Sequence, residues 1–127
     1  MITEDYTRRI IACAMNVHKE LGPGLLEKIY KLALAEELRQ NGFQVAVEVP
    51  VPVFYKGKRL SEDLRIDILV DHQVVIELKS VENSSPLYAK QTLTYLKLMN
   101  LTLGYVMNFN VVRVKDGIER IVNKFKE

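Results

Sequence analysis

Several features that define specialised classes of protein are missing from this chain. Cysteine occurs once, as Cys13, which excludes an internal disulfide and a zinc site built from clustered cysteines. No apolar run approaches the roughly 18 residues that a membrane-spanning helix requires. Residues 1–6 carry acids and no apolar core, unlike a secretory signal. We therefore expect a cytoplasmic protein in a reducing setting, with no membrane partner.

The composition that remains is that of an ordinary globular protein. The 127 residues are 48% hydrophobic and 27% charged, and 18 basic against 16 acidic residues give a net charge of +2. We expect one domain over residues 1–127, because two shorter units would each bury a poor core. A charge this small neither identifies nor excludes a protein that binds nucleic acid.

Helical spacing of apolar residues appears in three segments. The spacing predicts helices over residues 4–21, 25–40 and 87–99. Gly22 is well placed as the C-terminal cap of the first helix, and Pro86 suits the first turn of the third. The sequence between the second and third helices changes to a period of two, which is typical of strands.

That middle region predicts three antiparallel strands. Residues 45–53 alternate valine with other residues, and their prolines indicate an edge strand. Residues 56–58 (Lys-Gly-Lys) form a hairpin turn in this interpretation. In the second strand, 64–70, we expect the apolar residues Leu64, Ile66, Ile68 and Val70 on one face, with Asp67 opposite. The third strand is expected over 74–79.

The chain after the third helix predicts more strand. Residues 103–109 form one strand, while 111–114 and 118–122 flank Asp116-Gly117, a strong hairpin dipeptide. The last piece could instead contain a short helix. The order of elements predicts a mixed α/β or α+β fold with a central sheet.

Charged residues gather on the second and third strands. Glu77 and Lys79 are two apart and so share one face, and a hairpin would bring Asp67 close to Glu77. Two carboxylates at that range repel each other, and a bound divalent metal ion would neutralise their negative charge. The competing interpretation is a surface salt bridge between Glu77 and Lys79.

Two of the predicted helices carry further candidate site residues, each of which could instead have an ordinary structural role. Tyr88, Gln91 and Tyr95 share a stripe of the third helix, although Tyr95 could be a core aromatic and Gln91 its solvated neighbour. Glu27 and Tyr30 share a face of the second helix, where a first-turn glutamate could simply complement the helix dipole.

Four blocks of the chain, in this order, match a known family. They are Gly24–Tyr30, with the pattern Gly-x-x-Glu-x-x-Tyr, then Arg65–Asp67, Glu77–Lys79 and Gln91–Tyr95. With residues 103–110 they make the chain resemble the GxxExxY proteins of the PD-(D/E)XK nuclease superfamily. The resemblance implies a restriction-endonuclease-like fold with an αβββαβ core, its mixed sheet flanked by helices.

The resemblance also implies a metal site. Asp67 and Glu77 would be ligands of Mg²⁺ or Mn²⁺, and the backbone carbonyl of Leu78 would supply a further oxygen. Glu27 would complete or support the site from its helix. The sequence does not decide between one metal ion and two.

Further roles follow from the same resemblance. Lys79 would be the catalytic lysine, and Gln91 would orient the metal site or the substrate. Family members often carry histidine at the position of Tyr88, which weakens any role for that tyrosine. Substrate contacts are implied for Arg65, Tyr95 and Tyr30.

Together these observations predict a metal-dependent nuclease whose partner is nucleic acid, with DNA favoured. The alternatives are a catalytically silent module that binds nucleic acid or protein, and a structural partner with a vestigial site. Because one small domain offers little surface for DNA, a twofold homodimer is also expected. We expect His18, His72 and Cys13 to be structural or surface residues.

Overall fold

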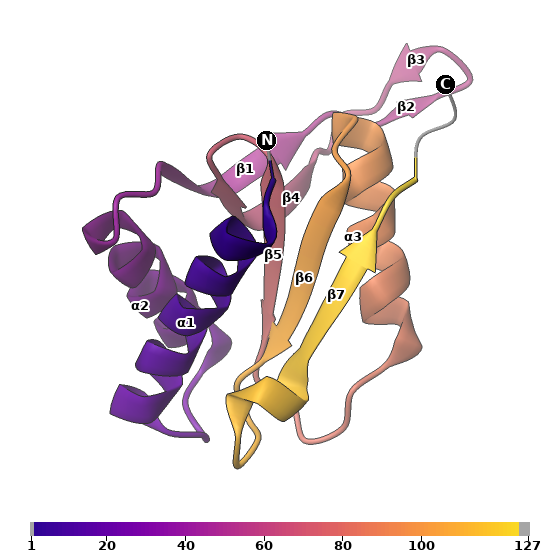
Figure 1. Ribbon diagram of the computed structural model, residues 1–127. Coiled ribbons are helices and arrows are strands. Elements are labelled where there is room, and N and C mark those ends of the chain that lie inside the picture. The colour runs from indigo at the N-terminus through magenta and orange to yellow at the C-terminus, as the bar shows by residue number, and fades with distance from the viewer. Residues whose placement is uncertain (1, 125–127) are drawn as a thin grey trace.

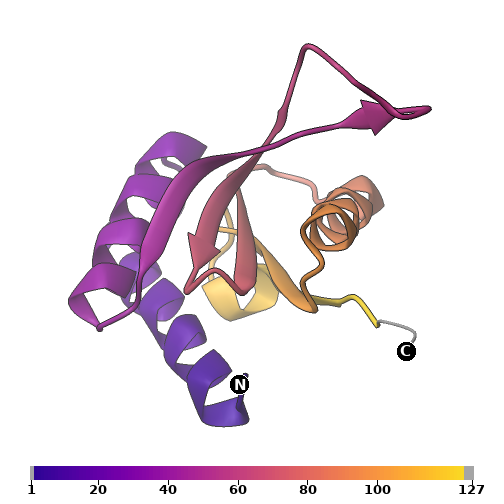
Figure 2. The ribbon, with the colours of Figure 1, turned by 90° about the horizontal axis from the view of Figure 1, so that it is seen from above.

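A five-stranded mixed sheet forms the centre of the computed structural model, which describes residues 2–124. Helices α1 and α2 lie on one side of the sheet and α3 lies on the other (Figures 1 and 2). The strand order is β1-β4-β5-β6-β7, and only the β5–β6 pair is parallel. The elements are α1 (Glu4–Leu21), α2 (Glu27–Gln40), β1 (Val45–Val51), β2 (Phe54–Tyr55), β3 (Lys58–Arg59), β4 (Leu64–Val70), β5 (Val74–Lys79), α3 (Pro86–Met99), β6 (Leu103–Asn108), the 3₁₀ helix η1 (Val114–Gly117) and β7 (Ile118–Val122).

This architecture confirms the predicted fold class. A helical layer, three antiparallel strands, α3 and the parallel strand β6 make up the αβββαβ core. Helix α1 has the predicted bounds and ends at Gly22, whose φ of 70° suits glycine. Helix α3 begins at Pro86, with the Ser85 hydroxyl accepting a hydrogen bond from the Leu87 N–H. Helix α2 begins two residues later than predicted, at Glu27.

The edge position of β1 and the turn at residues 56–58 are confirmed as well. β1 pairs only with β4, so its one proline, Pro50, removes no hydrogen bond from a central strand. β2 and β3 form a separate two-stranded sheet joined by Lys56 and Gly57, both at positive φ.

The predicted hairpin between residues 111–114 and 118–122 is wrong. β7 pairs antiparallel with β6 instead, and Val114–Gly117 forms the short helix that was the alternative. Phe109 and Val114 are buried in the core cluster under α1 and α2. The connection therefore follows the burial of these side chains, which outweighs the local preference of an Asp-Gly turn.

The sheet separates two apolar clusters, and the predicted alternation of β4 fails at the boundary between them. Ile68 and Val70 pack in the cluster under α1 and α2, whereas Leu64 and Ile66 pack with α3 on the other side. The change of side occurs at Asp67, which is missing from the pairing with β1 and from the pairing with β5.

A matching break lies on β1, opposite Asp67. Glu48 has a φ of 54°, in the left-handed region that a glutamate in a strand rarely adopts. Val45 accordingly packs with the α1 and α2 cluster, while Val49 and Val51 pack with the α3 cluster. The prediction that the alternating valines of this strand share one face is therefore wrong. The left-handed backbone at Glu48 turns the valines after it to the opposite side of the sheet.

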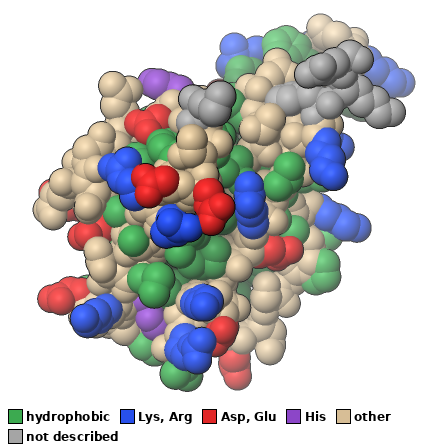
Figure 3. Space-filling view, in the orientation of Figure 1, with side chains coloured by type: hydrophobic (Ala, Val, Ile, Leu, Met, Phe, Trp, Pro, Cys, Tyr) green, Lys and Arg blue, Asp and Glu red, His purple; other side chains and the backbone are tan. Residues whose placement is uncertain are grey.

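Two general surface properties complete the description. No helix within residues 2–124 is long and apolar enough to cross a bilayer. On the face shown in Figure 3, acidic and basic side chains are interspersed with apolar ones, so this face carries no continuous basic stripe.

Candidate active site

Asp67 and Glu77 meet where β4 and β5 stop pairing. The regular ladder of these strands ends at Ile68 and Ile76. Beyond it, the Asp67 N–H donates to Glu77 Oε2 (2.8 Å), and the Leu78 N–H donates to Asp67 Oδ2 (2.8 Å). Each carboxylate thus replaces a backbone acceptor of the missing ladder, and the predicted closeness of the two acids is confirmed.

Both carboxylates are held in surroundings that disfavour their charge. Glu77 is 4% exposed, and burial together with the Asp67 carboxylate raises its pKa to about 8. Burial also raises the pKa of Asp67, against the opposing effects of the Leu78 hydrogen bond and of Lys31 and Lys79. A bound cation would relieve this unfavourable pairing of like charges.

One oxygen of each carboxylate takes no part in these hydrogen bonds. Within residues 2–124 every fully buried side-chain nitrogen and oxygen has a hydrogen-bond partner. Asp67 Oδ1 and Glu77 Oε1 have no such partner, so neither atom is fully buried. Hard carboxylate oxygens of this kind fit Mg²⁺ or Mn²⁺. The described residues contain no group of three or more His, Cys, Asp and Glu side chains arranged to hold a metal.

Lys79 lies beside this pair without forming a salt bridge to it. Its Nζ is 4.5 Å from the centre of the Tyr88 ring, and none of the ion pairs among residues 2–124 includes it. The Glu77–Lys79 surface salt bridge proposed as the alternative is therefore not present. Tyr88, to which the sequence assigned little, orients the ammonium.

Glu27 begins α2 and lies within electrostatic reach of the strands. Partial burial and the Asp67 carboxylate raise its pKa, while Lys79 and Lys31 lower it. The loop before it is fixed to the end of β5, because the Ser80 hydroxyl donates to the Leu25 carbonyl (2.5 Å). Glu27 is thus brought near the carboxylates, while its role as a metal ligand stays a prediction.

Two residues of this neighbourhood were missed in the sequence. Lys31 forms an ion pair with Glu48 and interacts electrostatically with Asp67 and Glu27. Lys31 is four residues after Glu27, so helical spacing was a signal that could have identified it. The Glu48 contact depends on a left-handed backbone, which no spacing rule indicates. An open hollow of about 530 Å³ lies beside them.

Tyr30, for which the resemblance implies a substrate contact, is buried in this structure. Its side chain is 0% exposed and stacks on Phe109, with ring centres 4.7 Å apart. The hydroxyl donates to the Gly22 carbonyl (2.5 Å) and accepts from the Leu25 N–H (3.1 Å). Tyr30 instead holds the α1–α2 turn, and thereby the start of α2, in place.

The remaining candidates differ in their closeness to the site. The Tyr95 ring packs in the α3 cluster, and burial, followed by the charges of Glu77 and Asp67, raises its pKa. Gln91 is exposed, one turn earlier on α3. Arg65 is also exposed and donates to the Glu48 carbonyl (3.4 Å). The roles of these side chains and of the Leu78 carbonyl stay predictions.

The three residues set aside in the sequence have structural positions. His18 is 8% exposed, and its Nε2 lies 2.9 Å from the Val111 carbonyl oxygen. His72 lies in the β4–β5 turn, and Cys13 is buried. None of them approaches the carboxylate pair in the contacts of the described residues.

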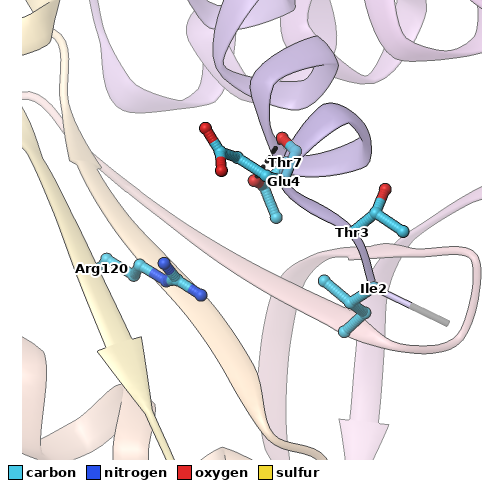
Figure 4. A pocket seen from close by; sticks show the side chains of 5 residues that line it. All are labelled: Ile2, Thr3, Glu4, Thr7 and Arg120. Atoms are coloured by element: carbon cyan, nitrogen blue, oxygen red, sulfur yellow. Dashed lines mark hydrogen bonds between the residues drawn. The ribbon is translucent and has the colours of Figure 1, made fainter.

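A second hollow, of about 380 Å³, lies at the start of α1 (Figure 4). In that view the Thr7 hydroxyl bonds to the Glu4 carbonyl (3.0 Å). Because Glu4 also pairs with Arg8, its charge is already compensated. This hollow therefore offers no reactive pair comparable to Asp67 and Glu77.

Comparison with known proteins agrees with the geometry at the level of the superfamily. A family model described as the PD-(D/E)XK nuclease superfamily matches residues 4–121, which include every element from α1 into β7. Comparisons with curated proteins and with solved structures give no significant match. The narrower resemblance to the GxxExxY proteins stays a prediction. The chain belongs to the PD-(D/E)XK nuclease superfamily.

Proposed function

We propose that this protein is a metal-dependent nuclease that hydrolyses phosphodiester bonds of nucleic acid, with DNA as the favoured substrate. The observation that carries this proposal is the Asp67–Glu77 pair, whose carboxylates bridge two separating strands and keep one oxygen each outside the hydrogen bonds between them. We further propose that residues 1–127 act as one domain in the cytoplasm.

The metal site in this proposal uses these two oxygens. Asp67 and Glu77 would hold Mg²⁺ or Mn²⁺, with the Leu78 carbonyl and Glu27 as further ligands. When bound, the ion supplies a Lewis acid for the phosphate and a lowered pKa for its water. Lys31 forms an ion pair with Glu48 and attracts Glu27, so it offsets the negative charge of these two neighbouring acids.

The chain's own residues bind and orient the scissile phosphate. Lys79 presents an ammonium that stabilises the negative charge developing on phosphate oxygens. Arg65, exposed on β4, contacts a neighbouring phosphate, and Tyr95 positions the substrate from α3. Gln91, one turn before Tyr95, orients the group attacked. Phosphate contacts of this kind fix the register of the nucleic acid without reading its sequence.

A catalytically silent binding module is the second candidate. It is favoured by the absence, among residues 2–124, of a group of three acids or histidines arranged for a metal. In that case the site would bind nucleic acid or protein without turnover. The two candidates differ in one measurable property, which is metal-dependent cleavage.

The decisive experiment compares cleavage by the wild type, Lys79→Ala and the matched surface variant Lys90→Ala. Linear, nicked and single-stranded DNA and RNA are incubated with Mg²⁺ or Mn²⁺, or with EDTA. We expect cleavage that needs the metal, disappears in Lys79→Ala and persists in Lys90→Ala. Absence of cleavage on every substrate, with binding intact, would support the silent module instead.

Two further measurements test the premises separately. Calorimetric titration with Mn²⁺ should give heat that disappears in Asp67→Asn, and no such heat would remove the metal site. A twofold dimer stays a prediction, and sedimentation showing a monomer at all concentrations would contradict it.

A further inference from the structure

A two-stranded arm leaves the body of the protein between β1 and β4. The arm consists of residues 52–63, and its strands β2 and β3 pair only with each other. Figure 2 shows it projecting beyond the sheet, away from α1 and α2 and on the side where α3 lies. Because the arm shares no ladder with the central sheet, its side chains do not serve the core.

Each face of the arm carries one aromatic ring beside one cation. Phe54 pairs across the strands with Arg59, and Tyr55 pairs with Lys58. Neighbouring residues of a strand point to opposite faces, so the two pairs lie on different faces. Phe54 and Tyr55 are each 62% exposed, which is unusual for large rings with no structural contact to make.

The tip of the arm adds a lysine at a costly position. Lys56 and Gly57 join β2 to β3 with φ values of 50° and 81°, the conformation of a two-residue turn that favours Asn and Gly. The turn itself does not require lysine at the first position. Lys56 Nζ lies 5.4 Å from the centre of the Tyr55 ring, so its charge is kept beside an exposed aromatic.

The arm starts at the same end of the sheet as the candidate active site. It joins the last residue of β1 to the first residue of β4, Leu64. Asp67 follows Leu64 by three residues, which is roughly 10 Å along an extended strand. Arg59, the nearest paired residue of the arm, precedes Asp67 by eight residues, so it lies at most roughly 29 Å along the chain from the carboxylate pair.

We propose that the arm binds unpaired nucleotides of the nucleic acid next to the cleaved bond, an inference that rests on the proposed nuclease function. Exposed rings stack on any base that is not already stacked in a duplex, and cations beside them bind the phosphates. Arg59 is oriented by Asp63 (3.2 Å), and Lys56 and Lys58 form no ion pair among the described residues.

Charge distinguishes this occupant from a second copy of the chain. The outer part of the arm, residues 54–60, contains three cations and no acid, while its two acids, Glu62 and Asp63, lie at its base, where Asp63 pairs with Arg59. Two arms packed together would bring like charges into contact, whereas a phosphate backbone neutralises them. Single strands fit better than duplex, because a duplex offers no free base face to Phe54 and Tyr55.

The test measures binding in EDTA, where no turnover occurs. Fluorescence anisotropy is recorded with a labelled oligothymidylate and with a blunt duplex of equal length. The double variant Phe54→Ala/Tyr55→Ala is compared with Val112→Ala, which removes an exposed apolar side chain elsewhere. We expect the double variant to lose about tenfold or more of its single-strand affinity, with duplex affinity and circular dichroism unchanged.

A second variant isolates the charge at the tip. Lys56→Asn keeps a residue that the turn favours, so the arm stays folded. We expect a weaker loss of single-strand affinity and a salt dependence reduced by about 0.7 in log–log slope. Lys115→Asn, on the distant helix η1, should leave both quantities unchanged.

Three outcomes would overturn the inference. They are unchanged single-strand affinity in Phe54→Ala/Tyr55→Ala, an equal loss for duplex, and a shift from dimer to monomer with oligonucleotide affinity unchanged. The last would make the arm a self-association surface. Since binding is measured without metal, failure of cleavage sinks the nuclease proposal alone, and failure of binding sinks the arm alone.

Discussion

The two halves of the β4–β5 hairpin have opposite properties, although they share the same strands. In one half, residues 68–70 pair regularly with 74–76 and the apolar side chains are buried on both faces. In the other half, the ladder gives way to hydrogen bonds between backbone and the carboxylates of Asp67 and Glu77.

The difference shows how one hairpin combines a stable core with the candidate site. Apolar burial in the regular half contributes favourable free energy of folding. In the other half, burial raises the pKa values of both acids and the Asp67 carboxylate further raises that of Glu77, so their ionised forms are held at a cost. The regular half therefore supports a site that would not form by itself.

The largest expected effect falls on the reactive half. In Lys79→Ala, cleavage should fall by about 10²- to 10⁴-fold, because the ammonium that stabilises developing charge is lost. Stability should change by about 1 kcal/mol, since the substitution removes the contact of Lys79 with Tyr88 and its attraction to the nearby carboxylates. Rate and thermal unfolding are measured on the same preparation. A variant that is slow because it is unfolded would remove the contrast between the halves.

The regular half should show the reverse pattern. Ile68 is 0% exposed, so Ile68→Ala should lower the free energy of unfolding by about 2–5 kcal/mol. The fraction that remains folded should keep its rate of cleavage per molecule. Denaturant unfolding and an active-fraction assay check both statements. An equal loss of rate per folded molecule would mean that the halves are not separable.

The pH dependence of stability should sharpen the comparison further. The folded state holds the Glu77 proton more tightly than the unfolded chain, since its pKa rises from 4.5 to about 8. In metal-free buffer the free energy of unfolding should therefore fall as pH rises from about 4.5 to about 8, on the order of a few kcal/mol.

Two variants test whether this pH dependence of the free energy of unfolding comes from Glu77. Glu77→Gln should flatten it, whereas Glu119→Gln on β7, an exposed position, should leave it as in the wild type. Addition of Mg²⁺ should raise stability most at the alkaline end, where the carboxylates are ionised. A slope that persists in Glu77→Gln would assign the titration to other groups.

The smallest expected effect concerns the strained residue opposite the site. Glu48→Gly and Glu48→Ala both remove the ion pair with Lys31, but only glycine accepts a φ of 54° without strain. Glu48→Gly should therefore be more stable than Glu48→Ala by about 1 kcal/mol in chemical denaturation. Equal stabilities would show that the break in β1 relaxes when the carboxylate is absent.

The sequence predicted the order of elements well because most local signals agreed. The caps of α1 and α3, the alternation in β5 and the turn at Lys56 all lie where the pattern indicated. Asp67 and Glu77 were also predicted to meet, since hairpin geometry alone brings them together. These features depend on residues near one another in the chain.

Features set by distant contacts were not predictable in the same way. The side change of β4 depends on Glu48 from another strand, and β7 joins β6 because Phe109 and Val114 are buried. Tyr30 matches the family pattern, yet only the fold shows its hydroxyl bound to Gly22. A pattern of residue types identifies which side chains belong together without showing which of them face solvent.

The contact between Lys79 and the Tyr88 ring bears on which cation neutralises the carboxylates of Asp67 and Glu77. A lysine tied to Glu77 would have to be displaced before a divalent ion could occupy the same oxygens. Here the ammonium rests on an aromatic face, 4.5 Å from the ring centre, and leaves those oxygens unoccupied by protein cations. A metal ion bound by those oxygens would therefore not have to displace the lysine from its ring.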